Sequence, residues 1–267
     1  MNTVADWLGE AADLPRDECI ALLCEITGLS HARILAFPDT PLEPSQLQQL
    51  QQARAALKTG IPLAYVLGHE DFWTLRLEVS ADVLIPRPET ELLVELALEH
   101  TPPEGRVLDL GTGSGAIAIA VAHSRGDLQV TATDRSAAAL AVAQANASSH
   151  EVDINFIHSD WFTELTGSYH TIVCNPPYIA AGDPHLPALK AEPECALVSG
   201  LDGLDDLRQV IGKAPQYLVP GGMLAVEHGY DQAPAVRELM EQAGLADVHS
   251  VKDLAQIARA TLGCRQD

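Results

Sequence analysis

A strand that runs directly into a glycine-rich turn restricts this chain to few folds. Residues 106–115 read RVLDLGTGSG, and the small-residue stretch Ala116–Ala122 that follows is predicted to be helical. The glycines let the backbone turn tightly out of a buried strand and approach a ligand closely, which a Cβ would prevent. We therefore expect a βαβ series to begin here, with a loop that binds a nucleoside cofactor.

Strands and helices alternate along the rest of the chain. The pattern predicts strands at 129–133, 154–158, 171–174 and 223–227, and helices at 137–147, 204–214 and 233–243. This alternation predicts an α/β fold with a doubly wound, mostly parallel sheet. A tail at 248–263 is expected to supply one or two antiparallel edge strands.

The first part of the chain has a different pattern. Apolar residues recur at three-to-four spacing up to about residue 58, which predicts a small helical bundle, and Ser45 is the predicted N-cap of its third helix. Glycines and prolines then bracket β-prone pieces. At 267 residues, more than one domain is natural. We predict an N-terminal bundle over 1–75, a β-hairpin linker over 76–90 and a catalytic domain over 91–267.

Composition excludes several classes of partner. The net charge of −21, from 37 acidic and 16 basic residues, repels duplex nucleic acid. Five cysteines without a CxxC pair and ten histidines without ligand spacing predict no metal site. No apolar run approaches the ~20 residues that cross a bilayer, and no secretory signal is present, so we expect a cytoplasmic protein without a membrane partner. We expect a monomer.

The glycine loop and the end of the next strand predict the cofactor. Asp134 is placed where a carboxylate can accept hydrogen bonds from both ribose hydroxyls. Gly111, Gly113 and Ala116 also fit the relaxed pattern of NAD-binding folds, and a turn kept only for packing is a further alternative. Asp109 and the lack of a second phosphate-binding feature favour S-adenosylmethionine. The predicted loop contacts are Asp109, Gly111, Thr112, Gly113, Ser114 and Gly115.

Two residues after the third predicted strand are candidates for the adenine end of the cofactor. Asp160 could accept a hydrogen bond from the adenine amine, and Trp161 could lie against the ring. A core position for Trp161 is the alternative reading. Both are predicted as cofactor contacts.

The tetrapeptide Asn175-Pro176-Pro177-Tyr178 follows the fourth predicted strand. The two prolines fix the backbone, so the carbonyl of Pro176 is a rigid acceptor beside the side-chain oxygen of Asn175. Two such acceptors hold a planar NH₂ group in one orientation, whereas a proline-rich turn without function is the alternative. An amide nitrogen is a poor nucleophile, so positioning against an activated methyl must supply the rate. Asn175, Pro176 and Tyr178 are the predicted catalytic residues, all four are predicted to bind the substrate, and Asn175 is also predicted near the cofactor.

These motifs together resemble the release factor glutamine N5-methyltransferase family (PrmC/HemK). The likeness also includes Glu192-Pro193 and the run 84–91, LIPRPETE. It implies that residues 85–91 border the active site, whereas a linker followed by a helix N-terminus is the alternative reading. It implies a seven-stranded Rossmann-like methyltransferase sheet, S-adenosylmethionine as cofactor, and transfer to the glutamine of the Gly-Gly-Gln motif in peptide chain release factors. It also implies that the N-terminal bundle recognises the protein substrate. The family usually has glycine after Asp-x-x near the end, whereas this chain has Gln256 after Asp253.

Other functions share parts of this pattern. A sister enzyme that methylates a ribosomal-protein glutamine carries the same motifs. A DNA adenine-N6 methyltransferase uses a similar acceptor loop but needs a basic recognition region, which the net charge of −21 argues against. An NAD oxidoreductase or a non-catalytic binding module would leave Asn175 to Tyr178 unexplained.

Overall fold

The computed structural model describes residues 2–266 and divides into two compact units. The first unit ends at His69 and the second begins at Glu70, so the division falls earlier than the predicted end of the bundle at residue 75. The predicted outer bounds, residues 1 and 267, lie outside the described residues. Each unit has its own apolar core, as expected of separate domains.

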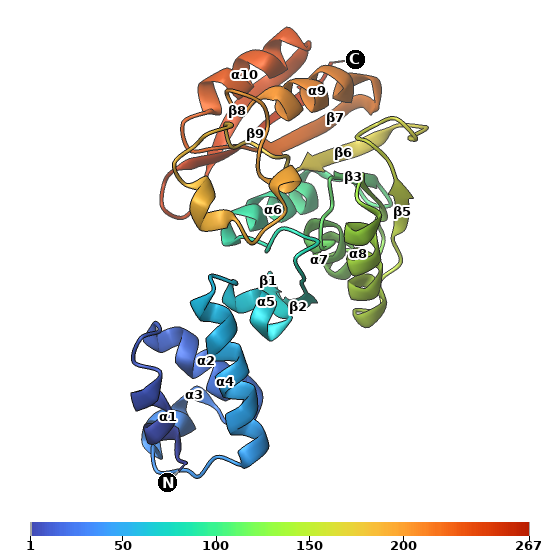
Figure 1. Ribbon diagram of the computed structural model, residues 1–267. Coiled ribbons are helices and arrows are strands. Elements are labelled where there is room, and N and C mark those ends of the chain that lie inside the picture. The colour runs from blue at the N-terminus through green and yellow to red at the C-terminus, as the bar shows by residue number, and fades with distance from the viewer. Residues whose placement is uncertain (1, 267) are drawn as a thin grey trace. The chain divides into compact units, whose positions relative to one another are not determined.

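The first unit is a helical bundle, which confirms that prediction. Its core includes Trp7, Leu22, Leu23 and Leu50, all almost inaccessible to solvent. The prediction of Ser45 as an N-cap was wrong, because the helix starts at Pro44, a residue preorganised for the first helical position. Glu43 is the N-cap and forms a capping box with Gln46, in which the side chain of each residue accepts from the backbone N–H of the other. The helices are α1 (Val4–Glu10), α2 (Arg16–Thr27), α3 (His31–Ala36), α4 (Pro44–Lys58) and α5 (Leu63–Leu67) (Figure 1).

The β-hairpin lies earlier than the predicted 76–90. Strands β1 (His69–Phe72) and β2 (Leu75–Glu78) are joined by a two-residue turn in which Trp73 has a φ of 57°. Residues 79–87 have no regular structure, and a short 3-10 helix, η1 (Pro88–Thr90), follows them. The prolines at 86 and 88 lack the N–H groups that a strand needs to pair, which explains the difference.

The second unit contains the seven-stranded sheet, in the order β5-β4-β3-β6-β7-β9-β8. The first five strands in this order are parallel, and β9 runs antiparallel to both of its neighbours. The tail was expected to supply one or two antiparallel edge strands, and it supplies one edge strand, β8, while β9 lies between β8 and β7. The strands are β3 (Arg106–Leu110), β4 (Gln129–Asp134), β5 (Asn155–His158), β6 (Tyr169–Cys174), β7 (Leu218–Glu227), β8 (Leu245–Lys252) and β9 (Ala258–Arg265).

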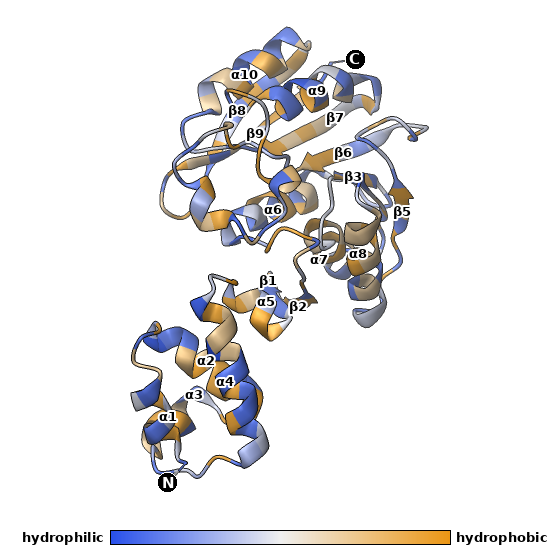
Figure 2. Cartoon of the chain, viewed as in Figure 1, coloured by the Kyte–Doolittle hydropathy of each residue, from blue (hydrophilic) through white to orange (hydrophobic). Residues whose placement is uncertain are grey.

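Helices cover both faces of the sheet, so the doubly wound fold is confirmed. Alternate residues of the central strands face opposite sides: Val107 packs with α6 and α7, whereas Leu108 packs with α9 and α10. Figure 2 shows β7 as largely apolar, while α9 carries both hydrophilic and hydrophobic residues. The helices are α6 (Glu91–His100), α7 (Ala116–Ser124), α8 (Ala137–Ser149), α9 (Asp205–Lys213) and α10 (Ala233–Gln242), with 3-10 turns η2 (Leu186–Leu189), η3 (Glu194–Ala196) and η4 (Ala214–Gln216).

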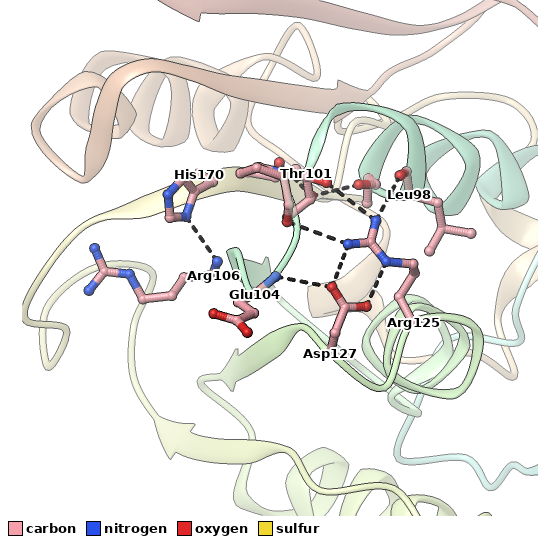
Figure 3. Close-up of polar contacts among 10 residues, drawn as sticks. Leu98, Thr101, Glu104, Arg106, Arg125, Asp127 and His170 are labelled. Carbon is pink, nitrogen blue, oxygen red and sulfur yellow. Dashed lines mark hydrogen bonds and ion pairs between the residues drawn. The ribbon is translucent and has the colours of Figure 1, made fainter.

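Polar contacts fasten the amino ends of the strands (Figure 3). The Arg125 guanidinium donates to both carboxylate oxygens of Asp127, at 2.7 and 2.6 Å, and to the carbonyl of Thr101 at 3.3 Å. The Arg106 N–H donates to Nδ1 of His170 at 2.9 Å. These contacts join the ends of α6 and α7 to the starts of β3, β4 and β6. Ligands in such sheets bind at the opposite, carboxyl ends of the strands.

Candidate active site

A pocket lies at the carboxyl ends of β3, β4, β5 and β6. The glycine loop and the ends of the neighbouring strands form its floor, and residues from 82–86 and 193–196 complete its walls. This is the crevice where a doubly wound sheet binds ligands. Eight predicted cofactor contacts line it, together with Pro177 from the predicted substrate site: Gly111, Thr112, Gly113, Ser114, Asp134, Asp160, Trp161 and Asn175.

Gly111 shows why the loop needs glycine. Its φ is +71°, a left-handed conformation that L side chains rarely adopt, and a Cβ at this position would lie 3.3 Å from Cζ3 of Trp161. The N–H groups of Gly111 and Thr112 both donate to the carbonyl of Thr133, at 2.9 and 2.8 Å. The loop is therefore fixed to β4 and lies directly against the tryptophan ring.

Asp109 supports the loop from beneath and does not line the pocket. It is buried, and its Oδ2 accepts from the Thr112 hydroxyl at 2.6 Å and from the Ala118 N–H at 3.3 Å. Burial raises the pKa of this carboxyl to about 7, because the charged form loses its hydration. Its position indicates that it shapes the loop, whereas we had predicted that it touches the cofactor.

Gly115 also lies outside the pocket wall. It has a φ of +85°, and a Cβ there would lie 2.7 Å from Cδ1 of Ile119 and 3.1 Å from Cβ of Ala143. This glycine lets α7 start close to α8. Like Asp109, it shapes the loop from behind.

Asp134 ends β4 with both carboxylate oxygens held in place. Oδ2 accepts from the Gly113 N–H at 2.9 Å, and Oδ1 accepts from the Ser136 N–H at 2.8 Å. Each oxygen keeps a further lone pair. A carboxylate fixed in this way at the pocket wall is suited to accept from a pair of ribose hydroxyls.

Asp160 and Trp161 form another part of the wall. Trp161 adopts a φ of 49°, uncommon for a residue with a large side chain, and is 8% exposed. It packs in the core with Leu110 and Phe162 and also lines the pocket, and its contact with the cofactor ring stays a prediction. Asp160 lines the pocket beside it and is exposed.

Asn175 follows β6 and faces the pocket together with Pro177. Its Nδ2 donates to Oγ1 of Thr90 at 3.2 Å, so the donor end of the amide is engaged and the oxygen remains as an acceptor. Pro176 is buried and does not line the pocket. Asn175 and Pro177 therefore line the same pocket as the glycine loop, and Pro176, between them in the chain, does not line it.

Tyr178 is also absent from the pocket wall. Its hydroxyl donates to Oε1 of Glu227 at 3.1 Å, and its carbonyl accepts from Nε2 of Gln232 at 3.0 Å. Burial and the neighbouring Glu227 carboxylate raise the pKa of the Tyr178 hydroxyl, so it stays a donor. These contacts tie the residue to the end of β7 and to α10, and the packing of its ring on the acceptor group stays a prediction.

Glu227 is a further buried carboxyl at this end of the sheet, and the sequence pattern did not predict it as a site residue. It is 2% exposed at the end of β7, and burial raises its pKa to about 7, although contacts with Thr90 and Tyr178 act in the opposite direction. A carboxylate at the carboxyl end of a predicted strand, beside the strand that carries the acceptor motif, was the available signal. It was read only as the end of an apolar strand.

One ion pair joins the two outer walls. The Arg87 guanidinium pairs with Glu192, which also accepts from the Ile85 N–H at 3.2 Å. Arg135 donates to the carbonyl of Cys195 at 3.0 Å. The family resemblance implied that residues 85–91 border the active site, and Pro86 and Thr90 from this segment line the pocket. The lining residues that were not predicted are Asp82, Val83, Leu84, Ala116, Ile117, Arg135, Ser136, Ala139, Ser159, Pro193, Cys195 and Ala196.

Two negative findings apply to residues 2–266. No group of three or more His, Cys, Asp or Glu side chains in this range is arranged to hold a metal ion. Over the same residues, every helix is too short or too polar to cross a bilayer.

Known proteins resemble this chain in sequence over nearly its whole length. The "PrmC N-terminal domain" model matches residues 2–68, and the "Methyltransferase small domain" model matches residues 88–191. A release factor glutamine methyltransferase from Xylella fastidiosa is 47% identical, over 94% of this chain and 93% of the relative. Another from Coxiella burnetii is 43% identical, over 99% and 97%.

A solved structure supports the fold. A methyltransferase from Pyrococcus furiosus superposes with a TM-score of 0.57 and 15% sequence identity, over 84% of this chain and all of that one. At this identity, the likeness concerns the fold.

Proposed function

The chain belongs to the release factor glutamine methyltransferase family, and we propose that it methylates the side-chain amide nitrogen, N5, of the glutamine in the Gly-Gly-Gln motif of peptide chain release factors. The chain is a methyltransferase, and S-adenosylmethionine is its methyl donor. One observation carries the proposal for the site: Asn175 presents an amide oxygen to the same pocket that the glycine loop and Asp134 line.

The pocket residues suit the parts of the cofactor. The fixed Asp134 carboxylate would accept from the ribose hydroxyls, and the backbone of Gly111 to Ser114 would lie along the nucleoside. Trp161 and Asp160 would contact the adenine, by ring packing and by accepting from the exocyclic amine. Bound cofactor supplies a methyl group already activated by a positively charged sulfur.

The acceptor loop suits an amide NH₂. Asn175 Oδ1 and the Pro176 carbonyl would accept one N–H each and hold the nitrogen in line with the methyl carbon. Hydrogen bonds from both N–H groups to these oxygens draw electron density toward the nitrogen, which offsets its weak nucleophilicity. The proton released after transfer passes to water. Pro177 and Tyr178 would form the rest of the glutamine site.

The N-terminal unit supplies surface for the protein partner. Its exposed apolar side chains, Leu35, Phe37 and Ile61, lie outside the bundle core. We propose that this unit contacts the release factor. The net charge of −21 supports a protein substrate over a nucleic acid. We also propose that the enzyme works in the cytoplasm, where release factors act, and as a monomer.

The decisive experiment follows radiolabelled methyl from S-adenosylmethionine into a purified release factor. Label should appear on the factor and vanish when the Gly-Gly-Gln glutamine is replaced by alanine. Parallel reactions with ribosomal proteins and with duplex DNA test the two competing acceptors. Transfer to a ribosomal-protein glutamine with none to the release factor would identify the sister activity and refute the proposal.

A further inference from the structure

The Gln232 side chain connects three loops near the carboxyl ends of β6 and β7. Its Oε1 accepts from the Gly229 N–H at 2.8 Å. Its Nε2 donates to the carbonyl of Tyr178 at 3.0 Å and to that of Gly203 at 3.3 Å. Tyr178 ends the acceptor loop, residues 175–178, while Gly203 precedes α9 and Gly229 follows β7. One amide therefore joins the acceptor loop to two other loops.

The partners of Gln232 set the orientation of its amide. A backbone N–H can only donate and a backbone carbonyl can only accept. The oxygen must therefore face Gly229, and the nitrogen must face Tyr178 and Gly203. The flipped amide would place like against like at all three contacts. This orientation does not depend on the protonation state of any group.

The side chain stands on a fixed piece of backbone. Gln232 is the N-cap of α10, its N–H donates to the Gly229 carbonyl at 3.0 Å, and its carbonyl accepts from the Val236 N–H at 3.0 Å. Val236 and Met240 fasten α10 to the sheet, since both are buried in the core. A side chain on such a base can hold a neighbouring loop in one place.

The acceptor loop is stiff enough to carry this constraint to its other end. Pro176 and Pro177 each fix φ at about −65° and provide no backbone N–H that could anchor the loop from within. At its start the loop follows Cys174, which pairs with both neighbouring strands. The position of the Tyr178 carbonyl therefore affects where the Asn175 side chain and the Pro176 carbonyl point.

Gly203 shows how closely the loops approach at this point. It has a φ of +76°, and a Cβ there would overlap the Tyr178 carbonyl oxygen and lie 2.8 Å from Nε2 of Gln232. The Tyr178 carbonyl thus occupies space that any other residue at position 203 would need. The contact with Gln232 is built into the shape of this loop.

We propose that Gln232 is a positioning residue for methyl transfer, which holds the Tyr178 carbonyl and so directs the two acceptors at the start of the loop. The inference rests on the proposed function for the identity of the group that these acceptors hold. Neither Gln232 nor Tyr178 lines the cofactor pocket, so turnover should depend on Gln232 and cofactor affinity should not. The Ile179 N–H still donates to the Leu197 carbonyl at 2.9 Å, so loss of Gln232 should shift the loop without releasing it.

Two variants at position 232 separate positioning from support of α10. Gln232→Met loses all three hydrogen bonds, whereas Gln232→Glu keeps an acceptor for the Gly229 N–H and loses the donors for the two carbonyls. Each should lower turnover by about tenfold, equivalent to about 1.4 kcal/mol, with S-adenosylmethionine affinity kept within about twofold. Gln216→Glu, at an exposed position, is the matched control and should turn over as the wild type does.

Wild-type turnover in Gln232→Glu would show that only the contact with Gly229 matters and would overturn the inference. Cofactor affinity that falls as much as turnover would overturn it as well, because it would indicate a general loss of structure. If Gln232→Glu fails to fold, Gln232→Met removes the same two donors without adding a charge.

A pair of glycine variants tests the same carbonyl from its other side. Gly203→Ala should lower turnover by about tenfold, because its Cβ would displace the Tyr178 carbonyl. Gly244→Ala has a similar φ, +80°, and a Cβ there would meet no described atom within 4 Å beyond its chain neighbours. This control carries the same backbone strain and should keep turnover within about twofold. Equal turnover in the two variants would contradict the role of the Tyr178 carbonyl.

A spectroscopic readout is independent of the substrate. The two Gln232 Nε2 protons can be assigned in the free protein by their loss in Gln232→Met. They should exchange slowly with solvent, because each has a carbonyl partner, and their shifts should change in Gly203→Ala but not in Gly244→Ala. Rapid exchange in the wild type would refute the inference. If the wild-type enzyme methylates no release factor, the proposed function fails, and these signals still decide whether Gln232 holds the Tyr178 carbonyl.

Discussion

The Gly113 N–H donates to Oδ2 of Asp134 at 2.9 Å, which links the glycine loop after β3 to the tip of β4. The second oxygen of the same carboxylate accepts from Ser136 at 2.8 Å. One side chain therefore orders two backbone segments of the pocket. It also keeps its outer lone pairs available to a ligand.

Asp134→Asn should weaken S-adenosylmethionine binding by about tenfold or more, since charge-assisted hydrogen bonds contribute about 1.5–3 kcal/mol each. The amide would turn an NH₂ toward one of the two backbone N–H groups and would lose an acceptor for ribose. Titration calorimetry measures this directly. Asp153→Asn, at an exposed position, is the matched control and should bind as the wild type does. Equal affinity in both variants would remove Asp134 from the cofactor site.

Asn175→Ala should abolish methyl transfer and leave most of the cofactor affinity. The amide oxygen is needed to hold the acceptor, whereas the nucleoside is held mainly by the loop after β3 and by Asp134. Single-turnover transfer at saturating cofactor, with calorimetry alongside, separates the two effects. An undiminished rate would contradict the role given to Asn175.

Gln256→Gly should stabilise the second unit by about 1 kcal/mol, because Gln256 has a φ of 65° and left-handed backbone is costly for residues with a Cβ. The turn keeps its hydrogen bonds: the Gln256 N–H donates to the Asp253 carbonyl at 2.9 Å. The missing glycine near the end of the chain has therefore not removed the turn. Thermal unfolding measures the change, and Ala255→Gly, which lacks the positive φ, should give no gain.

The buried Asp109 carboxyl, whose pKa is raised, should make the free energy of unfolding fall as pH rises. The folded state holds a proton up to a pKa of about 7, whereas the unfolded chain releases it near 3.8. The free energy of unfolding therefore falls as pH rises between these values, by up to about 1.4 kcal/mol per pH unit for one proton. Glu227, raised to about 7, contributes with the same sign.

Asp109→Asn removes one of these titrations, so urea unfolding from pH 4 to 8 should show a shallower decline than in the wild type. The control is Glu151→Gln, at an exposed position. A decline that is equally steep in Asp109→Asn would show that Asp109 is ionised throughout.

The sequence predicted the pocket residues at the ends of the strands better than it predicted the buried residues around them. Periodicity and glycine turns located the βαβ series and placed Asp134, Trp161 and Asn175 at one sheet edge, because parallel strands end together. Residues whose role depends on burial were not foreseeable in the same way. Glu227 and Asp109 lie in strands, and nothing local tells a buried carboxylate from one at a pocket wall.

Contacts between distant segments account for the remaining differences. Thr90 and Asn175 are separated by 85 positions, and Arg87 reaches Glu192 across 105. Local propensity holds no information on such pairs. The interior place of β9 is a further case, since its pairing with β7 is decided by the returning chain and not by its own pattern.

That placement of β9 bears on biosynthesis and on truncation. Its residues fill the gap between β7 and β8, so a chain cut anywhere before Ala258 would leave β7 with a bare row of amide and carbonyl groups. During translation, the sheet therefore exposes the unpaired backbone groups of β7 until β9 has emerged from the ribosome. Premature stop codons in this region should therefore yield aggregates, and not merely a shortened enzyme.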